Sequence, residues 1–270
     1  MLRSLYSGIS GLRAHQTMMD VTGNNISNVN TVGYKAAATL FQDTMSQTVA
    51  TGGRPQPPDR GGVNAAQIGL GVKLADIATN FRQGSQQPTG VGTDLMIQGD
   101  GFFVLEEGGQ TPFTRSGGFH FDSAQNLVAP NGAYVMGYDA GVVPAPGAPL
   151  VPMTLVPSAG VLPALLGTEK MTSYTISSTG EIIGQFDDDQ PRVLGQIATA
   201  TFVNPNGLEK AGNSTYRSNA TITGPADVGA AGTGSRGPMT SGSLEMSNVD
   251  LAPPWNTTRS SPRSHRPPTS

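Results

Sequence analysis

Residues 2–29 read LRSLYSGISGLRAHQTMMDVTGNNISNV, and large apolar side chains recur along them in alternating steps of three and four residues. Such steps form a heptad pattern, which predicts an amphipathic α-helix with one narrow apolar face. We call the six large apolar residues of that face the apolar stripe: Leu2, Leu5, Ile9, Leu12, Met19 and Ile26. Gln16 and Gly23 occupy the two positions of the pattern between the last three of them.

Three glycines weaken this predicted helix as an isolated structure. Gly8, Gly11 and Gly23 each lower its stability by up to about 1 kcal/mol relative to alanine. Complete burial of the six stripe side chains would contribute at most roughly 9–18 kcal/mol, so the helix requires a partner. The pattern alone leaves two partners open: the core of the chain's own domain, or helices of other subunits.

The composition predicts a turn-rich, mainly β chain around this helix. The 36 glycines and 21 prolines make up about a fifth of the 270 residues, and only 13% of the residues are charged. A net charge of −3 provides no basic surface for nucleic acid or for anionic lipid. The absence of cysteine excludes disulfides and thiolate metal sites. We therefore expect neither nucleic-acid binding nor membrane insertion.

Strand signals begin after a segment rich in asparagine, glycine and proline. Residues 24–35, NNISNVNTVGYK, favour a helix end because asparagine tolerates left-handed backbone conformations. Residues 51–62, with two glycine pairs and three prolines, predict a flexible linker. Beyond them, runs such as GFFVLE from Gly101 and YVMGY from Tyr134 predict strands, and Asn131-Gly132 predicts a hairpin turn.

Several of these segments together resemble the bacterial flagellar hook and rod family of axial proteins. The similarity begins with Leu2-Arg-Ser-Leu-Tyr-Ser-Gly-Ile-Ser-Gly and the asparagine-rich segment. It continues with DLMIQGDGFF from Asp94, FTRSGGF from Phe113, GNSTY from Gly212 and SGSLEMSNVDL from Ser241, and it covers about residues 1–251. The motif residues that we single out are Asn24, Asn25, Asn28, Gly33, Tyr34, Lys35, Gly99, Gly101, Phe102, Ser247, Asn248 and Val249.

The resemblance is strongest to the hook proteins of this family, and the distal rod proteins are the alternative. It implies a β-rich outer domain and an inner, coiled-coil-like domain in which N- and C-terminal helices pack together. It also implies export through the flagellar export apparatus and a place in the flagellum outside the cell. The implied partners are other hook subunits and neighbouring rod, hook-cap and hook–filament junction proteins, with no cofactor.

This reading divides the chain into five segments. They are an N-terminal helical rod domain (1–35), a linker (36–70), a β-rich outer domain (71–223) with an irregular insertion near 141–167, a return segment (224–251) and a disordered tail (252–270).

The tail departs from the family pattern, which continues with an amphipathic helix. Five prolines in residues 252–270 oppose a helix there, at about 3 kcal/mol for each interior proline. Our hypothesis is a frameshift, because codons can be chosen so that the frame one base earlier encodes a helical, family-like segment. We expect this 270-residue product, lacking the partner helix, to polymerise poorly or not at all. A genuine disordered basic terminus is the alternative.

The sequence offers little support for an enzyme. His15, His120 and His265 fall in separate segments without metal-ligand spacing, so we expect neither catalytic nor metal-binding residues. A secreted β-rich binding or hydrolytic module is the second class of function. Such a module would need a secretory signal, and residues 1–12 lack a small-residue cleavage site. The heptad pattern favours an assembly subunit instead.

Overall fold

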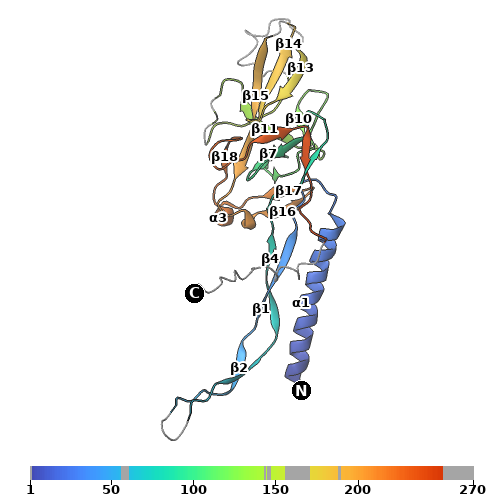
Figure 1. The fold of residues 1–270 in the computed structure, drawn as a ribbon. Helices are drawn as coiled ribbons and strands as arrows, with labels where there is room; N and C mark the ends of the chain where they lie inside the picture. The colour runs from blue at the N-terminus through green and yellow to red at the C-terminus, as the bar shows by residue number, and fades with distance from the viewer. Residues whose placement is uncertain are drawn as a thin grey trace, which may run out of the picture.

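The computed structural model describes residues 2–55, 61–142, 144, 147–155, 171–187 and 190–251, with side chains from Ser4 onward. It is mainly β with one long N-terminal helix, which confirms the predicted fold class (Figure 1). The tail after Leu251, including the position of the expected C-terminal helix, lies outside the described residues. So do residues 156–170, which contain the last part of the expected insertion.

The heptad segment forms α1 (Leu2–Ser27), close to its predicted length. The helix ends in turns, with the Asn28 N–H donating to the carbonyl oxygens of Asn24 and Asn25. Gly33, at φ +68°, then permits the chain to reverse direction.

A long two-stranded ribbon follows the helix and runs beside it (Figure 1). The strands are β1 (Ala37–Asp43), β2 (Ser46–Ala50), β3 (Ala66–Gly69) and β4 (Val72–Thr79), pairing β1 with β4 and β2 with β3, both antiparallel. We call these four strands the ribbon, and α1 with the ribbon the arm. We expected a linker over 36–70, but much of that segment is strand, because each strand depends on a partner that lies outside any local window.

The rest of the chain forms a β body built on one large sheet (Figure 1). Its main path is β13 (Met171–Ile176), β14 (Glu181–Phe186), β15 (Pro191–Thr201), β11 (Tyr134–Asp139), β7 (Phe102–Glu106), β8 (Phe113–Thr114), β17 (Thr215–Arg217) and β16 (Glu209–Gly212). Shorter strands join it: β9 (His120–Phe121), β10 (Leu127–Val128), β12 (Val151–Pro152) and β18 (Asp227–Ala230).

Among the described residues, the body also contains two small antiparallel pairs and two short helical turns. The pairs are β6 (Leu95–Ile97) with β19 (Met239–Ser241), and β5 (Gln86–Pro88) with β20 (Ser243–Glu245). The helical turns are η1 (Pro205–Gly207) and α3 (Ala220–Thr223).

Strand β7 separates two hydrophobic clusters of the body. Phe103 and Leu105 belong to one cluster, whereas Phe102 and Val104 belong to the other. This division follows from strand geometry, since successive side chains point to opposite faces of a sheet. All four residues are buried, so the body has an apolar core on both faces of β7.

Candidate functional site

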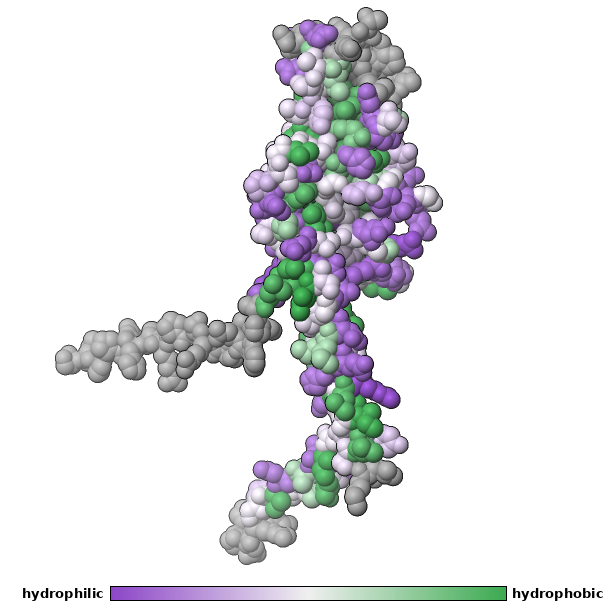
Figure 2. All heavy atoms as spheres, turned by 90° about the vertical axis from the view of Figure 1, so that its right-hand side faces the viewer, coloured by the Kyte–Doolittle hydropathy of each residue, from purple (hydrophilic) through white to green (hydrophobic). Residues whose placement is uncertain are grey.

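Four residues of the apolar stripe of α1 are exposed and do not pack against the rest of the described chain. Leu5, Leu12, Met19 and Ile26 recur every seven residues and are 60%, 74%, 67% and 53% exposed. Ile9 is partly buried, and the side chain of Leu2 lies outside the described set. Figure 2, viewed from the side of α1, shows hydrophobic residues gathered along the arm below the body. The stripe therefore does not pack on the chain's own core.

A different face of α1 packs against the ribbon, and its side chains are small or polar. Ala14 is buried there, and the Ser10 hydroxyl accepts a hydrogen bond of 3.3 Å from the Val72 N–H. Near the C-terminal end, the Asn25 amide donates to the Ala37 carbonyl at 2.7 Å and accepts from the Ala37 N–H at 3.0 Å. These polar contacts fix the helix on the ribbon while leaving its heptad face open.

The arm joins the body at a buried carboxylate, that of Glu245 in β20. Its Oε1 atom lies 2.6 Å from the Lys35 Nζ and accepts from the Gly84 N–H at 2.9 Å. Its Oε2 atom lies 3.5 Å from the Arg115 Nη1. The Lys35, Arg115 and Glu245 side chains are 0%, 2% and 1% exposed. We call these three residues the junction triad.

Further hydrogen bonds tie together the three chain segments that meet at the triad. The Gly33 N–H donates to the Glu245 carbonyl at 2.8 Å, and the Lys35 Nζ also donates to the Arg82 carbonyl at 2.9 Å. The Asn248 side chain donates to the carbonyl oxygens of Asn80 and Arg82 and accepts from the Ala36 N–H. The segments after α1, after β4 and after β20 therefore form one polar joint.

Burial and opposite charge act against each other in the triad. Burial lowers the pKa of the Lys35 ammonium, and the neighbouring Glu245 carboxylate opposes that shift. Burial also lowers the pKa of Arg115, again opposed by Glu245. The Arg115 guanidinium lies 5.3 Å from the centre of the Phe102 ring, and its Nη2 donates to the Gly99 carbonyl at 2.8 Å. Its Nε atom has no hydrogen-bond partner among the described residues.

Most of the motif residues chosen from the sequence lie at or near this joint. The Tyr34 hydroxyl lies 2.9 Å from Asn24 Oδ1 and 3.1 Å from Asn25 Oδ1, which holds the end of α1 over the joint. Two chosen residues make only local contacts in comparison: the Asn28 amide donates to the Asn24 carbonyl, and the Val249 N–H donates to the Ser247 hydroxyl. Gly101, at φ +142°, precedes β7.

Sequence reasoning did not single out Arg115 or Glu245, which complete the triad. Both residues lie inside segments that carried the family resemblance, FTRSGGF from Phe113 and SGSLEMSNVDL from Ser241. An ionisable side chain within such a motif could have marked each of them as a candidate site residue. The ion-pair partner of each side chain, however, is known only from the fold.

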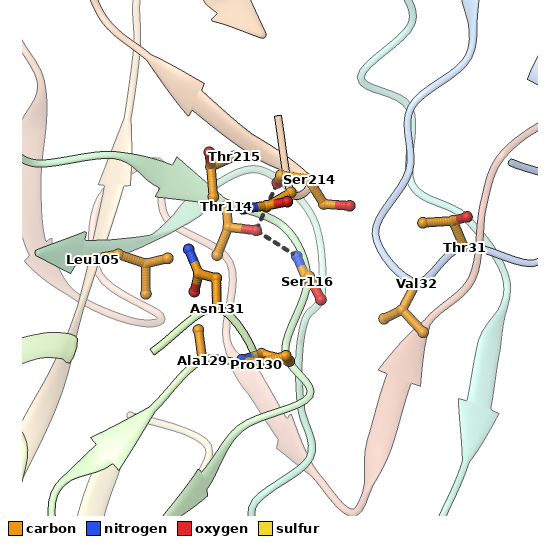
Figure 3. A pocket seen from close by; sticks show the side chains of 11 residues that line it. Thr31, Val32, Leu105, Thr114, Ser116, Ala129, Pro130, Asn131, Ser214 and Thr215 are labelled. Atoms are coloured by element: carbon orange, nitrogen blue, oxygen red, sulfur yellow. Dashed lines mark hydrogen bonds between the residues drawn. The ribbon is translucent and has the colours of Figure 1, made fainter. Parts of the chain in front are cut away.

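A cavity of about 380 Å³ opens beside the joint, between the loop after α1 and the body (Figure 3). Hydroxyl, amide and apolar groups line it, and its wall is held by Thr114, which donates to the Ser214 carbonyl and accepts from the Ser116 N–H. No charged side chain lines this cavity. Over the part of the chain that the structure describes, no group of three histidine, cysteine or acidic residues could hold a metal ion.

Two family models match the chain in the regions just described. A model of the flagellar hook protein FlgE/F/G D1 domain matches residues 96–184, within the body. A model of the flagella basal body rod protein matches residues 5–35, which are α1 and the turn after it.

Full-length similarity is found with a rod protein. The flagellar basal-body rod protein FlgG of Bacillus subtilis (strain 168) is 38% identical over 251 residues, which cover 93% of this chain and 86% of the relative. The chain belongs to the flagellar hook and rod protein family. This confirms the resemblance seen in the sequence, and it identifies the chain as a structural, non-enzymatic protein of the bacterial flagellum.

Hook proteins match a shorter part of the chain at higher identity. The flagellar hook protein FlgE of Treponema pallidum (strain Nichols) is 52% identical over 141 residues, and that of Borreliella burgdorferi is 50% identical over 141 residues. Each alignment covers 52% of this chain, but only 30% and 32% of the relatives.

The part of the chain that the structure describes contains no helix with the length and hydrophobicity of a membrane span.

Proposed function

We propose that this chain is a structural subunit of the flagellar hook, and that the apolar stripe of α1 is its polymerisation surface. The frameshift hypothesis for residues 252–270 predicts that the 270-residue product assembles weakly through this surface. The observation that carries the proposal is the exposure of four large apolar side chains at heptad spacing, from 53% for Ile26 to 74% for Leu12. A heptad face is suited to packing against the heptad faces of other helices. Helices of neighbouring subunits would supply that cover.

The higher identity to hook proteins supports the hook assignment. Identity reaches 52% with a hook protein, against 38% with the rod protein. The distal rod is the second candidate, because the rod protein aligns over 93% of the chain whereas the hook proteins align over 52%. The proposed partners are other copies of the chain, adjacent axial proteins of the rod, the hook cap and the hook–filament junction, and the flagellar export apparatus.

Antibody labelling of isolated flagellar bases distinguishes the two candidates. An antibody raised against the β13–β14 hairpin would be located by electron microscopy on bases purified from the source cells. The hook proposal predicts labelling along the curved hook. Labelling confined to the rod would replace the hook by the rod assignment, and absence of label from the whole axial structure would contradict both.

A pair of substitutions on α1 tests the role of the stripe. Leu12→Gln places a polar side chain on the stripe, and Arg13→Gln introduces the same residue at the next position, off the stripe. Glutamine is a good helix former, so neither change should disrupt α1 itself. We expect Leu12→Gln to lower incorporation into flagella below that of Arg13→Gln, with both variants made in the same 270-residue chain. Equal incorporation of both variants would show that the stripe does not mediate assembly.

A further inference from the structure

The arm and the body share few connections, and these converge on the junction triad. Three chain segments meet at the joint: the loop between α1 and β1, the segment after β4 through which the chain enters the body, and the segment after β20 (Figure 1). The Glu245 side chain contacts all the elements involved: Lys35 after α1, Gly84 after β4, and Arg115 of the body.

We propose that Glu245 is a clasp that sets the orientation of the arm relative to the body. In this role Glu245 is a positioning residue: it acts through the polar contacts of the joint and does not belong to the hydrophobic clusters of the body. The contacts of Glu245 hold the arm in one orientation. Without them, the segments that meet at the joint would permit others.

The charges of the triad explain why one carboxylate controls the joint. Lys35 and Arg115 are both buried, and Glu245 is the carboxylate that forms ion pairs with both. Without a buried anion, two cations held this close repel each other and lose the compensation for their lost hydration. Lys35 lies in the loop of the arm and Arg115 lies in the body. Separation of the arm from the body would therefore lower the repulsion between the two cations.

The hydrogen bonds around the carboxylate make the joint directional. Glu245 Oε1 accepts from Lys35 and Gly84, while the Glu245 carbonyl accepts from Gly33. Gly84 lies so close to the Met246 carbonyl that a side chain at position 84 would clash with it. The start of the segment after β20 therefore lies between the loop after α1 and the segment after β4, and these contacts restrict the orientation of the arm.

The order of the chain gives the clasp a further consequence. Lys35 and Glu245 are 210 residues apart, and Glu245 reaches the joint only when β20 pairs with β5. The triad therefore closes after most of the chain is present. Until β20 pairs with β5, the joint between arm and body lacks the Glu245 carboxylate.

Spin labels measure the orientation directly, because the chain contains no cysteine. Cysteines introduced at Ser46 on the ribbon and Val203 on the body, both exposed, would carry the labels on the full 270-residue chain as a monomer. We expect a single narrow distance distribution in the parent protein. In Glu245→Gln, which keeps the shape but removes the charge, we expect a distribution about twofold broader, as for a released hinge.

Two further variants make the result specific. Asp227→Asn breaks the 2.7 Å ion pair with Arg236 within the body, and we expect it to keep the narrow distribution. Asn248→Ala removes three hydrogen bonds of the joint while keeping Glu245, and we expect intermediate broadening. Near-ultraviolet circular dichroism reports whether the body remains folded in each variant.

A narrow distribution in folded Glu245→Gln would overturn the proposal. Loss of the body's aromatic signal in that variant alone would also overturn it, since Glu245 would then support the core. If Glu245→Gln cannot be produced as a folded protein, Asn248→Ala decides: a native distribution in that folded variant contradicts the clasp. The experiment uses monomers, so its outcome is independent of the hook or rod assignment.

Discussion

The arm and the body use the same apolar residue types in opposite ways. In the body, Phe103 and Leu105 are at most 1% exposed, whereas in the arm Leu12 and Met45 are 74% and 83% exposed. The body covers its own apolar surface and has the features of an independently folding domain. A two-stranded ribbon is marginally stable by itself, and extensive exposed apolar surface marks an interaction site. The arm is therefore the part of the chain that requires neighbours.

The largest effect on stability should come from the body core. Phe103 is fully buried and packs edge-to-face on Phe119 with ring centres 5.0 Å apart. We expect Phe103→Ala to lower the free energy of unfolding by about 3–5 kcal/mol, measured by urea denaturation. Val203→Ala, at a 90% exposed site of the same body, is the control. Equal effects of the two changes would mean that the body core does not dominate stability.

A slightly smaller effect should come from the joint between the two regions. Lys35→Met removes one cation from the junction triad and leaves Glu245 with Arg115 and the Gly84 N–H. We expect a loss of about 3 kcal/mol in urea denaturation, near the lower end for a broken buried ion pair. Asp227→Asn, which breaks a more exposed pair, should lose less than about 1 kcal/mol. If Lys35→Met leaves the free energy of unfolding unchanged, the charges of the triad do not stabilise the joint.

Alkaline pH should weaken the body through Tyr216. Burial raises the pKa of this phenol, so above pH 10 the unfolded chain releases a proton that the folded chain retains. Stability therefore falls as pH rises beyond about 10, the usual tyrosine value.

Replacing the phenol should reduce this pH dependence. In Tyr216→Phe the fall in unfolding free energy between pH 10 and 11 should shrink by up to about 1.4 kcal/mol per pH unit. Urea denaturation at several pH values measures it. Tyr6→Phe, on the exposed surface of α1, controls for the loss of a hydroxyl. If the unfolding free energy of Tyr216→Phe falls with pH as steeply as that of the parent protein, Tyr216 is not the group that causes the fall.

The smallest effect on the monomer should come from the stripe itself. Leu12→Ala removes a large side chain that is 74% exposed, so we expect a change within about 0.5 kcal/mol in urea denaturation of the monomer. A loss as large as that of Phe103→Ala would show that the stripe is buried within the monomer. That result would remove the distinction between a self-sufficient body and a dependent arm.

The amino-acid sequence by itself determined the features that depend on local order. The heptad steps predicted α1, because helical periodicity depends only on residues that are close together in the sequence. The composition and short alternating runs predicted a mainly β chain, and ordered motifs such as Gly33-Tyr34-Lys35 indicated the family. The exposure of the stripe was consistent with the helix pattern, but the pattern alone left its partner open.

Only the tertiary structure decided which distant residues meet. Lys35 and Glu245 form an ion pair across 210 positions, and Arg115 joins them from the body. The pairing of the ribbon strands within 37–79 was not predicted for the same reason, since a strand is stabilised by hydrogen bonds to a partner that local propensity does not identify. The structure likewise selected the small polar face of α1 for the ribbon and left the apolar stripe to the solvent, because backbone and side-chain hydrogen bonds at Ser10 and Asn25 fix the helix there.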